Sequence, residues 1–401
     1  MFPFRTVVVG TFLPTILFEI GVGAVLPIIA SSATRLGAGL TLAGLLVSLV
    51  PVGQILWDVP AGALAARIGD RQAMIVSGVI AAVGSVTAAL AVNVAMLAAA
   101  VLLLGAAAAG FFLARQSYLT EITPPLRRAR VLSTLGGVHR IGQFIGPFIG
   151  AALITVGSLT WSYWLSAVTA LLAILVVWLV KDDDARAPAP SRAAVVSVGD
   201  VWREHWRVFT TLGVAVLLIG AVRGARTTVL PLWAEYVGID PAHTSLIFGV
   251  AGAVDMLLFY PAGKVMDRLG RLWIGIPGMV VMGAALAVLP LTHAVTSIGA
   301  VAVLLGLGNG MPSGILMTLG ADVAPPAARA QFLGLWRILS DTGGAVGPLV
   351  LTAASAAGAI AVGIWVMAAS SLASVAAQAV WVPKFSVHAN RRTRRAAGLI
   401  P

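Results

Sequence analysis

The 401-residue chain contains no cysteine, and only 10% of its residues are charged. Without thiols it can form neither a disulfide framework nor a thiolate metal site. Its five histidines are scattered and lack the spacing of metal ligands. A glycine-rich phosphate loop, a nucleophile elbow and a dinucleotide-binding fingerprint are also missing. These absences argue against an enzyme, an ATP-driven pump and any metal or organic cofactor.

Apolar residues are abundant instead, at 59% of the chain, and the mean hydropathy is +0.99. Soluble domains carry about 25% charged residues, so this composition predicts an integral membrane protein. The apolar run at residues 6–33 is long enough to cross about 30 Å of hydrocarbon. Its length and the internal Glu19 favour a retained transmembrane helix over a cleaved signal peptide.

Twelve apolar stretches have the length of transmembrane helices, six on each side of a polar interruption. The interruption at residues 181–206 contains alternating Ala and Pro, which is typical of a linker. We expect an all-α membrane protein with a six-helix bundle at 1–180, a cytoplasmic linker at 181–206, a second six-helix bundle at 207–383 and a basic cytoplasmic tail at 384–401. The predicted helices lie at residues 6–34, 41–64, 73–92, 94–114, 132–157, 160–180, 207–234, 244–264, 273–292, 296–320, 332–357 and 360–382.

The two bundles are predicted to be copies of one module. The sequence YPAGKVMDRLGR at residues 260–271 resembles VPAGALAARIG at residues 59–69, and aligning Gly62 with Gly263 gives an offset of 201 residues. The same offset pairs Pro147 with Pro348 without an intervening gap. A constant offset of this kind predicts two pseudo-symmetric halves.

Lys and Arg are unevenly distributed among the predicted loops. If the N-terminus is cytoplasmic, cytoplasmic segments hold 21 of the 26 basic residues, Arg115 among them, and the outer loops hold only Arg35. The positive-inside rule then places both termini in the cytoplasm of a multi-pass protein of the cell membrane. Because the net charge of +11 lies mostly in these segments, we expect the tail to contact anionic lipid and not nucleic acid.

The loop between the eighth and ninth predicted helices carries the pattern GxxxDRxGR. Together with twelve helices in two copies, this pattern resembles the major facilitator superfamily, whose loop motif holds one state of the transport cycle at the cytoplasmic rim. The first copy has Ala66 in place of the aspartate, so the resemblance implies another acid there, for which Glu121 is the candidate. The alternative is that these charges only anchor loops at the headgroups. The predicted cytoplasmic gate comprises Gly62, Arg67, Gly69, Arg71, Glu121, Arg128, Gly263, Asp267, Arg268, Gly270, Arg271, Asp322 and Arg329.

The predicted helix at 132–157 contains Gly142, Gly146, Pro147 and Gly150. Glycines four residues apart share a helix face that a neighbouring helix can approach closely, and proline bends the helix. The pattern resembles the signature of the family's proton-driven exporters and therefore implies export. The second copy contains a similar pattern of glycine and proline, so the alternative interpretation is a bend with a purely structural role. The arginine that these exporters carry in their fourth helix is replaced here by Val101.

Charged residues within predicted membrane helices cost about 2.5 to 3.5 kcal/mol each and imply function. Glu19 is the leading candidate for a proton-coupling carboxylate, and Asp255 is the second. The duplication places Glu19 opposite Arg223 and aligns Arg140 with Asp341. The alternative is a set of static ion pairs that fix helix packing, and Asp58 fits this alternative best. The predicted central site comprises Glu19, Asp255, Arg223, Arg226, Arg140, Asp341 and Arg337.

These observations predict a monomeric secondary active transporter that couples proton entry to efflux of small lipophilic or amphipathic compounds by alternating access. One rival is an importer or facilitator of a small anionic metabolite in the same fold, because arginines outnumber unpaired acids in the predicted site. A second rival, from another class, is a membrane sensor that transports nothing.

Overall fold

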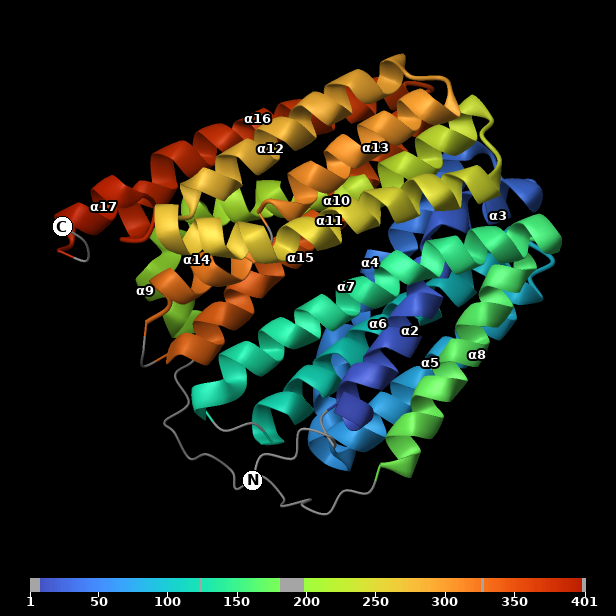
Figure 1. The fold of residues 1–401 in the computed structure, drawn as a ribbon, viewed down its shortest axis with the longest axis horizontal. Helices are drawn as coiled ribbons and strands as arrows, with labels where there is room; N and C mark the ends of the chain where they lie inside the picture. Colours follow the sequence, from blue (N-terminus) through green and yellow to red (C-terminus); the bar gives the residue numbers. More distant parts are fainter. Residues whose placement is uncertain (1–7, 123–124, 181–197, 313, 326–327, 399–401) are drawn as a thin grey trace.

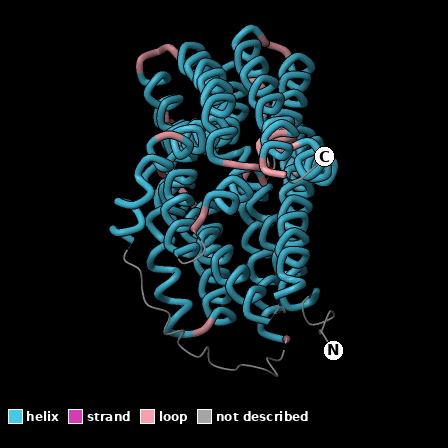
Figure 2. Tube along the Cα trace, turned by 90° about the vertical axis from the view of Figure 1, so that its left-hand side faces the viewer, coloured by secondary structure: helices cyan, strands magenta, loops and turns pink. Residues whose placement is uncertain are grey.

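The structure is a computed structural model that describes residues 8–122, 125–180, 198–312, 314–325 and 328–398. Within these ranges the chain folds into helices joined by short turns (Figure 2). The helices gather into two bundles, one coloured blue to green and the other yellow to red (Figure 1). Each bundle has buried apolar clusters of its own, so each has its own core.

The N-terminal bundle contains six spanning segments. The first is a composite of η1 (Val8–Phe12), α2 (Leu13–Val25), η2 (Leu26–Ile28) and α3 (Ile29–Arg35). Pro27 lies in η2, where it removes a backbone donor and interrupts the α-helical hydrogen bonding. The other five are α4 (Leu40–Ile68), α5 (Asp70–Ala89), α6 (Val94–Ile122), α7 (Pro125–Val156) and α8 (Thr160–Leu179).

The C-terminal bundle repeats this order. The fourth spanning segment of this bundle, which is the tenth of the chain, is broken between α13 and α14, next to Gly314, which has a φ of +80°. Glycine adopts this left-handed conformation without steric cost. The elements are α10 (Leu212–Val237), α11 (Pro241–Leu269), α12 (Leu272–Val288), η3 (Leu289–Leu291), α13 (Val295–Gly310), α14 (Ile315–Val323), α15 (Arg329–Ala356) and α16 (Ile360–Phe385).

Within the described residues, ten segments are long and apolar enough to cross a membrane. The two others are α7 and α15, which match their neighbours in length but carry polar residues. His139, Arg140 and Gln143 lie on α7, and Arg337 and Asp341 lie on α15. With these two helices, the predicted arrangement of twelve membrane helices in two six-helix bundles is confirmed.

Two shorter helices, α9 (Val198–Thr210) and α17 (Arg391–Ala396), go beyond the predicted set. α9 begins inside the predicted linker, whose residues 181–197 lie outside the described ranges. Phe209 of α9 packs against Phe332 of α15, with 4.8 Å between the ring centroids. α9 therefore lies on the C-terminal bundle, and α17 lies at the end of the same bundle (Figure 1).

The glycines of α7 face α2. A Cβ atom built on Gly146 would lie 2.8 Å from the backbone nitrogen of Ala24, and one built on Gly142 would lie 2.8 Å from the carbonyl oxygen of Ile16. Gly150 meets Ala24 at an ordinary contact distance of 3.4 Å. A larger side chain at Gly142 or Gly146 would therefore push α2 away, and with it the position of Glu19.

The C-terminal bundle packs α15 against α10 in the same way. A Cβ atom built on Gly347 would lie 2.7 Å from the backbone nitrogen of Ala225, and one built on Gly343 would lie 3.0 Å from that of Ala221. The sequence offset thus corresponds to the same close helix contact in both halves. This contact fixes α2 and α10, the helices that carry Glu19 and Arg223, against their neighbours.

Candidate functional site

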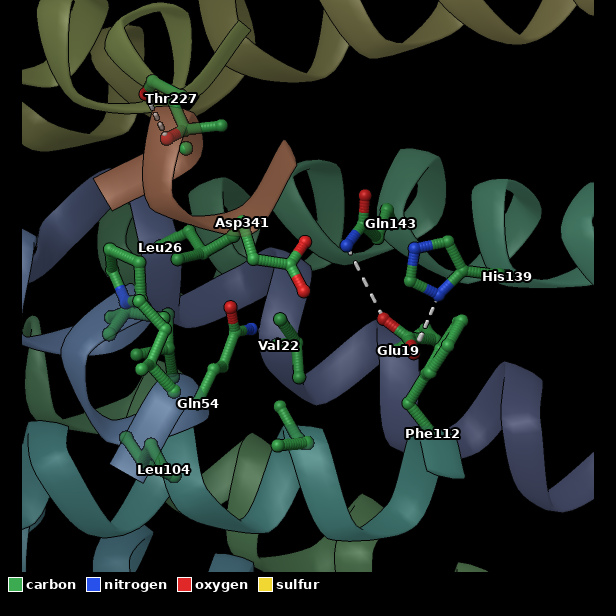
Figure 3. Close-up of a pocket in the computed structure, with 18 of the residues that line it drawn as sticks. Glu19, Val22, Leu26, Gln54, Leu104, Phe112, His139, Gln143, Thr227 and Asp341 are labelled. Atoms are coloured by element: carbon green, nitrogen blue, oxygen red, sulfur yellow. Dashed lines mark hydrogen bonds and ion pairs between the residues drawn. The ribbon is translucent and has the colours of Figure 1, made fainter. Parts of the chain in front are cut away.

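A cavity of about 470 Å³ lies between the two bundles. Its walls come mainly from α2, α4, α6 and α7 of the N-terminal bundle and from α10 and α15 of the C-terminal bundle, with a few residues from neighbouring elements such as α8. Most of the lining is apolar and includes Val22, Leu26, Leu104 and Phe112 (Figure 3). The polar lining residues are Glu19, Gln54, Asp58, His139, Gln143, Ser166, Arg223, Thr227, Arg337, Ser340 and Asp341.

Glu19 of α2 is buried in the wall of this cavity and has three polar partners. One carboxylate oxygen lies 3.1 Å from Arg115 Nη1 and 2.7 Å from His139 Nδ1. The other oxygen accepts a weaker hydrogen bond of 3.4 Å from Gln143 Nε2 (Figure 3). Buried carboxylates are stable only when they are paired and hydrogen-bonded, and this network meets that requirement.

Arg115 is the full counter-charge of Glu19, which corrects the sequence-based placement of this arginine on the cytoplasmic side. Arg115 lies on α6 and is completely buried. Its guanidinium also lies 4.9 Å from the ring centroid of Phe112, close enough for a cation–π contact. The positive-inside count misplaced it because the apolar run ending at residue 114 continues as helix to Ile122.

His139 is a site residue that the sequence analysis missed. It lies on α7, lines the cavity and contacts Glu19. The available signal was its place beside Arg140 within an apolar run of 132–157. The histidines were considered only as metal ligands, so a histidine that pairs with a carboxylate was not recognised.

Asp255 of α11 is the centre of a second network. It accepts a 2.7 Å hydrogen bond from Arg140 Nη1 of α7 and a 2.6 Å bond from Asn309 Nδ2 of α13. Arg226 Nη1 lies 3.8 Å away. Arg223 Nε donates to the amide oxygen of Asn309 at 2.8 Å. Two guanidinium groups thus contact one carboxylate, a third, that of Arg223, is linked to it through Asn309, and the Arg140 bond joins the two bundles.

The predicted alignment of Arg140 with Asp341 does not become a contact. Arg140 pairs with Asp255, whereas Asp341 pairs with Arg337 one helical turn away on α15, at 3.3 Å. The Arg337 guanidinium also lies 5.2 Å from the ring centroid of Phe112, which belongs to the other bundle. A sequence offset identifies equivalent positions, but the pseudo-twofold relation between the halves does not make them neighbours.

Glu19 and Arg223, which the duplication places opposite each other, both line the cavity. Each is bonded within its own bundle, Glu19 to Arg115 and Arg223 to Asn309. The structure therefore places both side chains at the same cavity, but it does not pair them with each other.

In the loop between α11 and α12, Arg271 forms a two-pronged contact with Asp322. Its Nη2 and Nε atoms donate to the two carboxylate oxygens at 3.0 and 3.2 Å. Ser386 Oγ donates to the same carboxylate at 2.6 Å. Two of the predicted gate residues thus meet at the end of the C-terminal bundle, together with a serine of the tail.

The tail of the chain covers this loop. The backbone nitrogens of Arg271 and Leu272 donate to the carbonyl oxygens of His388 and Ala389 at 3.1 and 3.0 Å. Arg394 of α17 donates to the carbonyl oxygen of Arg268 at 3.2 Å. Part of the tail thus binds the motif loop, and the contact of the tail with anionic lipid stays a prediction.

The equivalent loop between α4 and α5 is held differently. Arg71 donates to the carbonyl oxygens of Val177 and Trp178, at 3.0 and 2.7 Å, near the end of α8. Gly69 and Gly270 end the preceding helices with φ values of +86° and +110°, which explains the glycine at both positions.

Other predicted gate residues do not make the close approach expected of the motif. Cβ atoms built on Gly62 and Gly263 would meet open space, and Arg67 and Arg268 are exposed. The side chains of Glu121, Arg128, Asp267 and Arg329 lie outside what the structure describes, so their roles stay predictions.

The two bundles also meet at the opposite end of the molecule. Glu235 of α10 accepts hydrogen bonds from Ser31 Oγ at 2.5 Å and from Thr34 Oγ1 at 2.6 Å, both on α3. Ser48 of α4 and Thr352 of α15 form a further bond of 3.1 Å between the bundles. These contacts bring the halves together at the end predicted to face outward.

Comparison with known proteins connects this architecture to a family. The family model of the Major Facilitator Superfamily matches residues 11–348. The multidrug resistance protein MdtH of Edwardsiella ictaluri is 25% identical over 339 residues, which cover 83% of this chain and 82% of that protein. MdtH of Proteus mirabilis is 23% identical and covers 71% of each chain.

Solved structures share the fold at lower identity. A crystal structure of a POT family transporter in complex with a thioalcohol-conjugated peptide has a TM-score of 0.79 and 13% identity, and the match covers 95% of this chain and 96% of that one. The human organic anion transporter MFSD10 (TETRAN) has a TM-score of 0.67 and 17% identity, covering 94% of this chain and 99% of that one. These likenesses establish the fold.

Proposed function

Because the chain belongs to the Major Facilitator Superfamily and is therefore a multi-pass membrane transporter of small molecules, we propose that it exports lipophilic or amphipathic compounds in exchange for protons. The observation that carries this proposal is the buried Glu19 carboxylate in the wall of the cavity between the bundles. A buried carboxylate whose partners are rearranged during the cycle changes its proton affinity, which is what coupling requires.

The cavity supports a lipophilic cargo. Its lining is mainly aliphatic and aromatic, with a few polar groups, and such sites bind apolar molecules with loose shape requirements. The similarity to proteins named multidrug resistance proteins supports efflux as the direction. We place the protein in the bacterial inner membrane with both termini cytoplasmic, on the basis of the positive-inside count, and expect it to act as a monomer.

The contacts between the bundles support alternating access. Ser31, Thr34 and Glu235 join the halves at the predicted outer end, while the cavity extends between the halves to Asp58 and Arg337. This arrangement fits a state that is closed on the outside. Opening to the outside requires the Glu235 bonds to break and the cytoplasmic ends of the bundles to approach each other.

Protons supply enough free energy for this work. Moving one charge down a potential of 100 mV releases about 2.3 kcal/mol, and each pH unit adds about 1.4 kcal/mol. One proton per molecule of a neutral substrate therefore sustains a concentration ratio of about 50 from the potential alone. No ATP-binding site is needed for such a gradient.

The test is transport by Glu19→Gln in proteoliposomes. The variant keeps the shape and one acceptor oxygen of the side chain but cannot ionise, so we expect efflux driven by a pH gradient to fall at least 100-fold. Substrate counterflow, which requires no net proton movement, should survive. Asp255→Asn is the matched control, because it tests the second buried carboxylate. Full pH-driven transport by Glu19→Gln would remove Glu19 from the coupling role.

A second candidate function follows from the surroundings of Asp255. The carboxylate carries one negative charge, whereas three positive charges lie in its network, on Arg140, Arg223 and Arg226. Arg223 also lines the cavity. Such a surplus favours an anionic substrate, and thus the importer or facilitator of an anionic metabolite. Transport direction in inside-out vesicles separates the two functions, since a proton-driven exporter accumulates a lipophilic dye when the lumen is acidic.

A further inference from the structure

Three ionisable side chains meet at the proposed proton site, and they differ sharply in their contact with the cavity. The Glu19 side chain is 7% exposed and that of Arg115 is 1% exposed, whereas His139 is 31% exposed. Water in the cavity therefore reaches the imidazole much more readily than it reaches the carboxylate. This difference raises the question of how a proton enters and leaves Glu19.

The spacing between His139 and Glu19 requires a shared proton. His139 Nδ1 lies 2.7 Å from Glu19 Oε1. At that distance two atoms that both act as acceptors repel each other, so one of them carries a hydrogen directed at the other. Arg115 Nη2 lies 3.2 Å from the same ring nitrogen, but a guanidinium stays protonated and cannot take up or release the proton.

The second ring nitrogen of His139 points away from Glu19 (Figure 3). His139 lines the cavity, so this nitrogen, Nε2, is the one available to cavity water. The imidazole thus has one nitrogen on the buried carboxylate and the other toward solvent. This is the geometry of a proton shuttle, because an imidazole can take up a proton at one ring nitrogen while it releases one at the other.

We propose that His139 transfers protons between the cavity and Glu19. This inference rests on the proposed function, in which Glu19 carries the coupled proton. In uptake, Nε2 accepts a proton from a hydronium ion in the cavity, which becomes water, while Nδ1 gives its proton to Glu19 Oε1. One O–H bond of the hydronium ion and the N–H bond at Nδ1 break, an N–H bond at Nε2 and an O–H bond at Glu19 form, and the imidazole ends neutral. Release to the cytoplasm is the reverse.

The other groups around His139 do not offer a competing route. Glu19 approaches from α2 and Arg115 from α6, and Gln143, on its own helix, has an amide that does not titrate. Asp58 of α4 and Arg337 and Asp341 of α15 also line the cavity, and the next residue on α7, Arg140, is directed to Asp255. Among the described residues, His139 is the contact of Glu19 that lines the cavity and has two ring nitrogens able to exchange a proton.

The experiment compares two rates in proteoliposomes for His139→Gln: uptake of a lipophilic fluorescent cation, ethidium, driven by a pH gradient, and ethidium counterflow at equal pH. We expect the ratio of driven transport to counterflow to fall at least tenfold. Gln143→Leu is the matched control, because it removes another partner of Glu19 that holds no mobile proton. It should change both rates by the same factor.

Chemical rescue keeps the test decisive if His139→Gln is poorly folded. His139→Ala leaves space for free imidazole, which can bridge cavity water and Glu19, so 10 to 50 mM imidazole should raise driven transport several-fold without raising counterflow. A purely structural histidine would show equal losses in both rates and no rescue, and that result would overturn the shuttle. Loss of coupling in Glu19→Gln with normal coupling in both His139 variants also rejects the shuttle alone. Intact coupling in Glu19→Gln instead rejects the proposed function itself.

Discussion

The two buried charge networks differ in balance and in what they connect. Glu19 lies within the N-terminal bundle with one full counter-charge, Arg115, and one imidazole. Asp255 faces Arg140 from the other bundle, Arg226 at longer range and the amide of Asn309. The first network is close to neutral and local, whereas the second carries excess positive charge and spans the two halves.

This difference separates two tasks that a coupled transporter must perform. The Glu19 network is suited to gain or lose a proton, because all of its members move together within one bundle. The Arg140 to Asp255 contact is suited to hold the bundles together, because any rocking of the halves must stretch it. His139 and Arg140 are consecutive on α7, so one turn of this helix touches both networks. A proton at Glu19 can therefore influence the contact between the halves through α7.

The largest expected effect comes from removing the counter-charge of the local network. Arg115→Met leaves the Glu19 carboxylate buried without its guanidinium, and breaking a buried pair in this way costs about 3 to 5 kcal/mol. We expect a fall in the thermal unfolding midpoint in detergent, measured by intrinsic tryptophan fluorescence. The double variant Arg115→Met with Glu19→Gln should recover most of the loss. Equal midpoints for the single and double variants would contradict the assigned pairing.

Arg140→Met should cost less. Asp255 keeps its bond from Asn309 and the longer contact with Arg226, so we expect a loss of about 1.5 to 3 kcal/mol, the range for a hydrogen bond to a charged group. The same thermal assay measures it. Because Arg140 joins the bundles, the variant should also increase hydrogen exchange in α11 near Asp255, which Arg115→Met should not do. Unchanged exchange in α11 would mean that the contact does not hold the halves.

The two equivalent loops, between α4 and α5 and between α11 and α12, give a smaller contrast. Asp322→Asn removes the charge that Arg271 and Ser386 share, and we expect a loss of about 1.5 kcal/mol. The tail after Ser386 should then be cut more quickly by trypsin in limited proteolysis. Arg71→Lys is the matched change in the other half; its carbonyl partners still accept from an ammonium, so it should leave tail cleavage unaltered. Equal cleavage rates in the Asp322 variant and the parent would show that the ion pair between Arg271 and Asp322 does not hold the tail in place.

The smallest effect concerns Gly39 and Asp240, the N-cap residues that precede α4 and α11. The sequence offset makes these two positions equivalent. Asp240 caps α11 by accepting from the backbone nitrogens of Ala242 and His243, whereas Gly39 caps α4 without a side chain. Gly39 has an extended backbone and open space around a Cβ. Gly39→Asp should therefore stabilise the protein by a few tenths of a kcal/mol, and Asp240→Gly should destabilise it by a similar amount. The measurement is the thermal unfolding midpoint, which should rise in Gly39→Asp and fall in Asp240→Gly.

The Asp240 cap also has a predicted pH dependence. Partial burial raises the pKa of this carboxyl, but hydrogen bonds and charge from His243 outweigh it and bring the pKa below its ordinary value of 3.8. A lowered pKa means that the folded state binds protons less readily than the unfolded state. The contribution is therefore present above pH 3.8 and disappears as the pH falls through the lowered pKa. Asp240→Asn should remove this dependence from thermal unfolding measured between pH 3 and 5.

Most of the fold could be predicted from the sequence because membrane helices are defined by long apolar runs and by duplication. The tail helix α17 and the amphipathic α9 escaped because their positions depend on contacts with distant elements, such as the ring of Phe332 and the carbonyl of Arg268. The sequence of a single segment does not reveal which distant residues it will contact in the folded protein.

The site could be predicted in composition but not in pairing. Glu19, Asp255 and the arginines were identifiable because charges are rare within apolar runs, and most of them do meet in the two networks. The partners were wrong for Arg140, and Arg115 and His139 were overlooked, because helix rotation and the crossing of α2, α6 and α7 decide which side chains touch. Arg115 in particular looked like a loop residue, since only the length of α6 shows that it lies within the helix.

The docking of α17 on the loop between α11 and α12 makes the end of the chain a rigid attachment point on the C-terminal bundle. A fluorophore at Arg392, which is exposed on α17, would travel with that bundle, and a second at the exposed Arg67 would travel with the other. Because the chain has no thiol of its own, these two sites can be labelled through introduced cysteines in the otherwise native protein. The pair would report, molecule by molecule, how closely the ends of the two bundles that carry these loops approach each other as substrate and protons are supplied.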